Sequence, residues 1–141
     1  MSVKRILVGI DDSEESQRAL AFAIDLGRSL NAQIIACHAI GKLPRTPEGE
    51  VVPLDTFRAT VVQSFEEEWC RHLDESGLRS QKIIVDGNPI ATLITIADEE
   101  KADLLVVGSG HHTIDTYLGS ASHQLIEHSP IPVVVVPPKS S

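Results

Sequence analysis

The segment Lys4–Ser16, KRILVGIDDSEES, decides how the chain begins to fold. Its first part, Lys4–Ile10, is a short apolar run containing β-branched residues, which predicts a buried strand. Ser13 is a good helix N-cap residue, and Glu14 and Glu15 follow it in the first turn, where acidic side chains are favourable. A buried strand therefore leads directly into a helix.

Apolar strands and amphipathic helices keep alternating to the end of the chain. After a first helix that ends near Gly27–Ser29, the predicted elements are strands Gln33–Ile40, Lys82–Val85, Asp103–Val107 and Ile131–Val136 and helices Leu54–Ser76, Ile90–Glu100 and Ala121–His128, with a surface loop over Gly41–Pro53. This order predicts a single α/β domain over residues 1–141, a three-layer α/β/α fold around a five-stranded parallel sheet of Rossmann-like type. Ligands bind such sheets beyond the carboxyl ends of the strands, here near Asp11 and Gly108.

Composition excludes several classes of function. The 141 residues are 42% apolar and carry a formal charge of −8, and Lys and Arg form no basic patch in the sequence, so neither nucleic acid nor an anionic membrane is an expected partner. No stretch approaches the roughly 20 apolar residues of a membrane helix, and the first apolar run is too short for a signal peptide, so we expect a cytoplasmic protein. Cys37 and Cys70 lie in apolar stretches and are expected to be buried, reduced thiols.

The segment Val106–Ser122, VVGSGHHTIDTYLGSAS, carries the strongest local signal. Gly108 and Gly110 have no Cβ, and Gly119 and Ser120 fall where a helix begins, so free N–H groups there would suit a phosphate. From spacing alone, a strand-to-helix loop with Gly119 and Ser120 as capping residues is an equally good interpretation. The segment contains neither a Walker loop nor a dinucleotide fingerprint.

Other candidate residues have ordinary explanations beside the functional ones. Asp11 is expected to point into the crevice, although acidic residues before a helix commonly serve as capping and dipole partners. His111 and His112 are more typical of a solvated loop than of a metal site, because no acidic or Cys partner lies at a fixed spacing. A catalytic triad of Ser120, His111 and Asp115 is not favoured, so no catalytic residue is assigned.

The glycine segment resembles the signature of the universal stress protein family. That signature is Gly, two residues, Gly, nine residues, then Gly with Ser or Thr; here Gly108 and Gly110 are one residue apart and Gly119-Ser120 follows after eight. The segments ILVGIDDSEESQRAL, DGNP, ADLLVVGS and SPIPVVVVP resemble the family's other elements. The likeness extends over nearly the whole chain apart from Gly41–Pro53 and part of the long helix, and it implies an adenine nucleotide alpha hydrolase-like fold.

The resemblance implies a regulatory, stress-response module that binds ATP, with Mg²⁺ helping to neutralise the phosphates. The adenosine would be flanked by Gly9, Ile10 and Asp11, with the Asp11 carboxylate near the ribose and the Ala39 main chain at the adenine edge. The phosphates would be surrounded by Gly108, Gly110, Gly119, Ser120 and Ala121.

The same resemblance leaves alternatives open. The span from Gly108 to Gly119 is two residues shorter than the signature, so a homodimeric interaction module without nucleotide affinity is the alternative. An enzyme, such as a slow ATPase or a hydrolase, is a further alternative. A homodimer is expected through the terminal strand Ile131–Val136, as an apolar edge strand calls for a partner.

Overall fold

Five parallel strands form the centre of the molecule. The computed structural model describes residues 2–41, 47–49, 54–109 and 120–138. The sheet has the order β3-β2-β1-β4-β5 and every neighbouring pair is parallel, which confirms the predicted sheet. The strands are β1 (Arg5–Gly9), β2 (Gln33–Ile40), β3 (Ser80–Asp86), β4 (Leu104–Gly108) and β5 (Val133–Val136).

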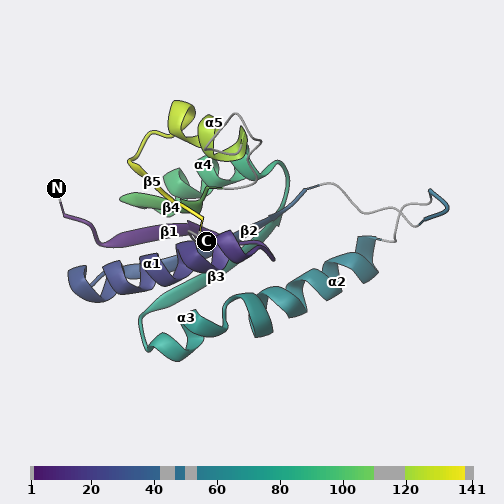
Figure 1. Ribbon diagram of the computed structural model, residues 1–141, viewed down its shortest axis with the longest axis horizontal. Helices are drawn as coiled ribbons and strands as arrows, with labels where there is room; N and C mark the ends of the chain where they lie inside the picture. Colours follow the sequence, from purple (N-terminus) through teal and green to yellow (C-terminus); the bar gives the residue numbers. More distant parts are fainter. Residues whose placement is uncertain (1, 42–46, 50–53, 110–119, 139–141) are drawn as a thin grey trace.

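Helices cover both faces of the sheet, as predicted for three layers. One face carries α1, α2 and α3, and the opposite face carries α4 and α5 (Figure 1). The helical segments are α1 (Glu14–Leu30), α2 (Leu54–Ser64), the π-helical turn η1 (Phe65–Trp69), α3 (Arg71–Ser76), α4 (Pro89–Glu99) and α5 (Ser120–His128).

Side chains alternate between two cores because successive residues of a strand point to opposite faces. In β1, Ile6 and Val8 pack with α1 and the η1–α3 segment, whereas Leu7 packs with α4 and α5. All three are fully buried. Burying one such side chain contributes roughly 1.5–3 kcal/mol.

The helix ends follow local capping chemistry. Ser13 caps α1, and its Oγ accepts the Ser16 N–H at 3.1 Å. Asn31 ends α1 in the left-handed conformation, with φ 54°. Asn88 caps α4 by accepting the N–H groups of Ile90 and Ala91. The predicted bounds of these elements differ from the observed ones by a few residues.

The predicted single helix over Leu54–Ser76 is wrong in one respect. Phe65–Trp69 forms a π turn, closed by the Cys70 N–H donating to the Phe65 carbonyl at 3.0 Å, and a short helix follows. The apolar stripe over this segment repeats every four residues, whereas an α-helix has 3.6 residues per turn. A wider turn brings the stripe back toward the sheet, so that Phe65 and Leu73 are both buried.

The strand order reverses between β1 and β4. From β1 the chain moves through β2 to β3 at one edge, and α4 then carries it back to β4 and β5. The helices after β1 and β4 cover opposite faces, which leaves a crevice at the carboxyl ends of these two strands. The sequence indicated this position through Asp11 and Gly108.

Candidate functional site

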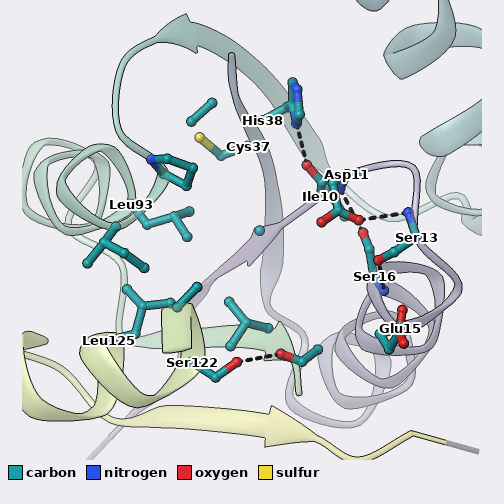
Figure 2. Close-up of a pocket in the computed structure, with 17 residues that line it drawn as sticks. Ile10, Asp11, Ser13, Glu15, Ser16, Cys37, His38, Leu93, Ser122 and Leu125 are labelled. Carbon is teal, nitrogen blue, oxygen red and sulfur yellow. Dashed lines mark hydrogen bonds between the residues drawn. The ribbon is translucent and has the colours of Figure 1, made fainter. Parts of the chain in front are cut away.

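A cavity of about 190 Å³ opens at the carboxyl ends of β1 and β4. Figure 2 shows polar side chains from the β1–α1 turn on one side of it and Leu93 and Leu125 on the other. Its described lining residues are Gly9, Ile10, Asp11, Ser13, Glu15, Ser16, Cys37, His38, Ala39, Pro89, Ile90, Leu93, Val107, Gly108, Ala121, Ser122 and Leu125.

Hydrogen bonds hold the turn between β1 and α1 in place. The Asp11 N–H donates to the Oγ of Ser16 at 2.9 Å, and Ser16 is buried. The Asp11 carboxylate accepts the Ser13 N–H through Oδ1 at 2.8 Å. A carboxylate has about four acceptor positions, so this bond leaves capacity for a ligand. Asp11 therefore stabilises the turn before α1 and also forms part of the cavity wall.

His38 fixes the residue that directly follows β1. Its Nδ1 lies 2.6 Å from the Ile10 carbonyl oxygen, and because a carbonyl can only accept, Nδ1 must carry the hydrogen. The ring lies edge-on to Trp69, with centroids 5.0 Å apart. The Ile10 N–H is used as well, since it donates to Cys37 at 2.8 Å. The Ile10 N–H and C=O are thus both bonded within the protein, and its side chain is in the core.

Among the described residues, the end of β2 has no strand paired with it on the side that faces the site. The Cys37 carbonyl faces β1 and accepts from Ile10, whereas the Ile40 carbonyl faces β3 and accepts from Gly87 at 3.0 Å. Main-chain groups of a strand alternate between its two sides, so the N–H and C=O of Ala39 face the β1 side. The register of β1 with β2 ends at the pair Gly9 and Cys37, so no described strand continues there. Ala39 therefore presents a donor and an acceptor to the cavity.

The opposite wall is apolar and comes from α4, α5 and β4. Leu93, Val107 and Leu125 are all buried and belong to the core between the sheet and these helices. Cys37 adds its thiol to this wall, and burial raises the pKa of that thiol to about 11. The thiol is therefore neutral at pH 7, and the wall suits a flat, uncharged ring.

The glycines at the two strand ends serve packing. A Cβ on Gly108 would lie 2.8 Å from main-chain and Cβ atoms of Glu15, so the missing Cβ lets α1 pack closely on the end of β4. A Cβ on Gly9 would meet Leu93 Cδ1 at 3.2 Å on the other face. The carbonyl of Gly108 accepts the Ser122 hydroxyl at 2.8 Å, which ties the first turn of α5 to β4.

The structure brings many of the predicted site residues to one cavity. Those that line it are Gly9, Ile10, Asp11, Ala39, Gly108 and Ala121. Ser120 begins α5, and its side chain is not described; Gly110 and Gly119 lie outside the described residues, as do His111, His112 and Asp115. Their proposed part in holding phosphates stays a prediction.

Sequence reasoning missed the lining residues outside its motifs. His38 lies in the predicted strand Gln33–Ile40; its Nδ1 is hydrogen-bonded to the protein, and its ring also borders the cavity. Leu93 lies in the predicted helix Ile90–Glu100, whose apolar spacing puts it on the buried face. That spacing cannot show that the inward face of α4 also meets an opening beside β2.

Two kinds of feature are absent from the described residues, a metal-binding cluster and a membrane-spanning helix. They contain no cluster of three or more His, Cys, Asp or Glu side chains able to hold a metal ion. None of their helices combines the length and the apolar character needed to cross a membrane.

Comparison with known proteins agrees with this geometry. A model of the Universal stress protein family matches residues 2–137. The chain belongs to the universal stress protein family. Universal stress protein Sll1654 of Synechocystis sp. is 29% identical to it over 136 residues, covering 95% of this chain and 85% of that protein.

Solved structures resemble this universal stress protein along its whole length. The protein MJ0577 superposes with a TM-score of 0.76 at 26% identity, covering 100% of both chains. A universal stress protein in complex with cAMP superposes with a TM-score of 0.71 at 26% identity, covering 96% of this chain and 98% of that one.

Proposed function

We propose that this universal stress protein binds an adenine nucleotide in the cavity between β1 and β4 and acts as a regulatory module, with ATP as the nucleotide. The observation that carries the proposal is the unpaired main-chain edge of Ala39 beside an apolar wall. A relative of the same fold is described in complex with cAMP, which shares the adenosine part of ATP.

The cavity matches the adenosine part of such a ligand. The edge of adenine has an amino group that can donate to the Ala39 C=O and a ring nitrogen that can accept from the Ala39 N–H. The faces of adenine need apolar surface, which Leu93 and Val107 supply. The Asp11 carboxylate is available to the ribose hydroxyl groups. At about 190 Å³ the cavity is smaller than the roughly 300 Å³ at which pockets for drug-sized ligands begin, so phosphates would extend beyond it, toward Ala121 at the start of α5.

Mg²⁺ would be held jointly by the protein and the phosphates. The described residues offer carboxylate and hydroxyl oxygens at the cavity, from Asp11, Glu15 and Ser13, and oxygen is the ligand that Mg²⁺ prefers. They form no complete cage of their own. When bound, Mg²⁺ would neutralise part of the negative charge of the phosphates.

Isothermal titration calorimetry with adenosine, cAMP and ATP tests this proposal. A matched pair of variants sharpens it: Ala39→Pro removes the N–H that faces the cavity, whereas Ala39→Val keeps it. We expect the wild type and Ala39→Val to bind, and Ala39→Pro to bind at least about tenfold more weakly, which corresponds to one lost hydrogen bond. Absence of heat and of thermal shift with every adenosine compound at millimolar concentration would favour the interaction module without nucleotide affinity.

We also infer a homodimer through β5. This strand is at the edge of the described sheet, and Val133, Val134 and Val135 are half-buried. The carbonyls of Pro132 and Val136 accept from β4, so by alternation the main-chain groups of Val133 and Val135 face outward.

Exposed apolar side chains near this edge support the same interface. Arg18 Nε donates to the Pro137 carbonyl at 3.2 Å, which places that face of α1 beside the end of β5, and Phe22 follows one helical turn later with 41% exposure. On the other face Ile126 of α5 is 48% exposed. A second copy pairing antiparallel with β5 would cover both.

Sedimentation equilibrium tests the dimer. We expect twice the chain mass of 15.3 kDa for the wild type and a monomer for Val135→Pro, which removes an outward N–H and no bond to β4. A monomeric wild type at micromolar concentration contradicts the interface.

A further inference from the structure

Glu15 is a second acidic residue in the wall of the cavity, beside the Gly108 end where phosphates are expected. Glu15 lines the cavity from the first turn of α1 and is half-buried (Figure 2). Its main chain and Cβ pack directly on Gly108, the first glycine of the segment predicted to surround the phosphates. Among the described residues its carboxylate makes neither a hydrogen bond nor an ion pair.

The described wall of the cavity has an excess of negative charge. Asp11 and Glu15 contribute two carboxylates, and no Lys or Arg is among the described lining residues. The sequence between Lys101 and Lys139, which includes the whole glycine segment, contains no Lys or Arg. The N-termini of α1 and α5 each contribute the equivalent of about half a positive charge, which offsets about one carboxylate of the two.

We propose that Glu15 is a specificity-determining residue that makes nucleotide binding depend on phosphate charge, so that the site accepts adenosine, cAMP or magnesium-bound ATP and rejects metal-free ATP. This inference rests on the proposed function, because it needs an adenosine compound in the cavity. Its physical basis is repulsion between the Glu15 carboxylate and uncompensated phosphates at a half-buried position, where screening by salt is incomplete. Mg²⁺ lowers the phosphate charge by two and so relieves that repulsion.

Calorimetric titrations of adenosine, ATP with EDTA and ATP with excess Mg²⁺ test the inference, on the wild type and on three variants. Glu15→Gln removes the charge at nearly constant shape, and Glu15→Lys reverses it. Glu14→Gln is the matched control, because Glu14 has the same charge in the same helical turn, is exposed and does not line the cavity.

We expect Glu15→Gln to bind metal-free ATP roughly tenfold more tightly than the wild type, and Glu15→Lys more tightly still. Adenosine affinity should change by less than about twofold in all variants, because adenosine is uncharged. Glu14→Gln should match the wild type with every ligand.

The titrations distinguish a failure of the Glu15 role from a failure of the nucleotide site itself. If adenosine binds but metal-free and magnesium-bound ATP bind equally well to the wild type and to Glu15→Gln, the role of Glu15 is overturned and the nucleotide site stands. The role of Glu15 is also overturned if Glu14→Gln raises the affinity for metal-free ATP as much as Glu15→Gln does, since the effect would then come from the net charge of the protein. If adenosine, cAMP and ATP all fail to bind to wild type and variants, the proposed function itself is overturned.

Discussion

The two walls of the cavity are built in opposite ways. On the β1–α1 side, Asp11, Ser16 and His38 are positioned by hydrogen bonds to or from main-chain groups, at 2.6–2.9 Å. On the α4–α5 side, Leu93 and Leu125 are positioned by side-chain packing alone. Directed bonds fix the polar wall before any ligand arrives, whereas apolar contacts can adjust. If the cavity binds a nucleotide as proposed, the first wall would give the specificity for the ligand and the second wall the contact area.

The largest expected effect compares the two strand-end glycines. In Gly108→Ala the new Cβ would meet the main chain of Glu15 at 2.8 Å, and a helix backbone cannot easily move. In Gly9→Ala it would meet the ends of the Leu93 and Val107 side chains at 3.2 and 3.3 Å, which can rotate. We expect Gly108→Ala to lower the free energy of unfolding by about 3 kcal/mol and Gly9→Ala by about 1 kcal/mol or less. Urea denaturation measures both, and equal losses contradict the difference between the walls.

Truncation of the apolar wall should have the next largest effect. Leu93 is 7% exposed, so Leu93→Ala removes buried methyl groups next to an existing cavity. We expect a loss of about 2 kcal/mol in the free energy of unfolding, at the low end for such changes because solvent already reaches the site. The volume-conserving variant Leu93→Met is the control and should lose less than about 1.5 kcal/mol. Urea denaturation compares the two losses in the free energy of unfolding. A larger loss for Leu93→Met than for Leu93→Ala would show that this wall is not packed as described.

Removal of one directed bond from the polar wall should cost less. Ser16→Ala deletes the Oγ that accepts the Asp11 N–H, and the vacated amide is part-buried. We expect about 1 kcal/mol less stability. Affinity for adenosine should fall as well, because Asp11 loses its anchor. A variant that keeps full adenosine affinity would show that the turn needs no such bond.

The thiols have the smallest effect at pH 7, where it is absent, and they affect stability only in alkaline solution. Burial raises the pKa of Cys37 to about 11 and is the main cause that raises the pKa of Cys70 to about 12. Above about pH 9 the unfolded thiols lose protons that the folded ones keep, so stability falls as the pH rises, by up to about 1.4 kcal/mol per pH unit for each thiol. Cys37→Ala should show a shallower decline between pH 9 and 10 than the wild type. Parallel declines would mean that the Cys37 thiol is not protected by burial.

Much of the fold could be predicted from the sequence because its signals are local. The β-branched run before Ser13 and the Ser13 cap with Glu14 and Glu15 behind it each depend on neighbours in the chain. The π turn at Phe65–Trp69 was not predicted, because apolar residues repeated every four positions also fit an α-helix over one or two turns. The difference from 3.6 residues per turn becomes apparent only over several turns. The packing of Gly108 on Glu15 was also missed, since it joins elements far apart in sequence.

In the candidate site, too, sequence signals indicate some residues, whereas others depend on tertiary contacts. Asp11 could be predicted because it directly follows a strand, and Ala39 only through a family resemblance. The reason that Ala39 is available is that β1 ends at Gly9 while β2 continues to Ile40, and relative strand length is a tertiary property. Ser16 and His38 likewise depend on the partners that the fold brings to them.

The Ala39 main chain is the point on which the account depends most. A titration of ¹⁵N-labelled protein with adenosine, followed by two-dimensional ¹H–¹⁵N NMR, observes its amide directly. We predict that the Ala39 amide resonance moves downfield on saturation and is among the most strongly shifted signals, because the N–H changes from an unpaired group to a hydrogen-bond donor. Saturable binding of adenosine that leaves the Ala39 resonance in place would contradict that prediction.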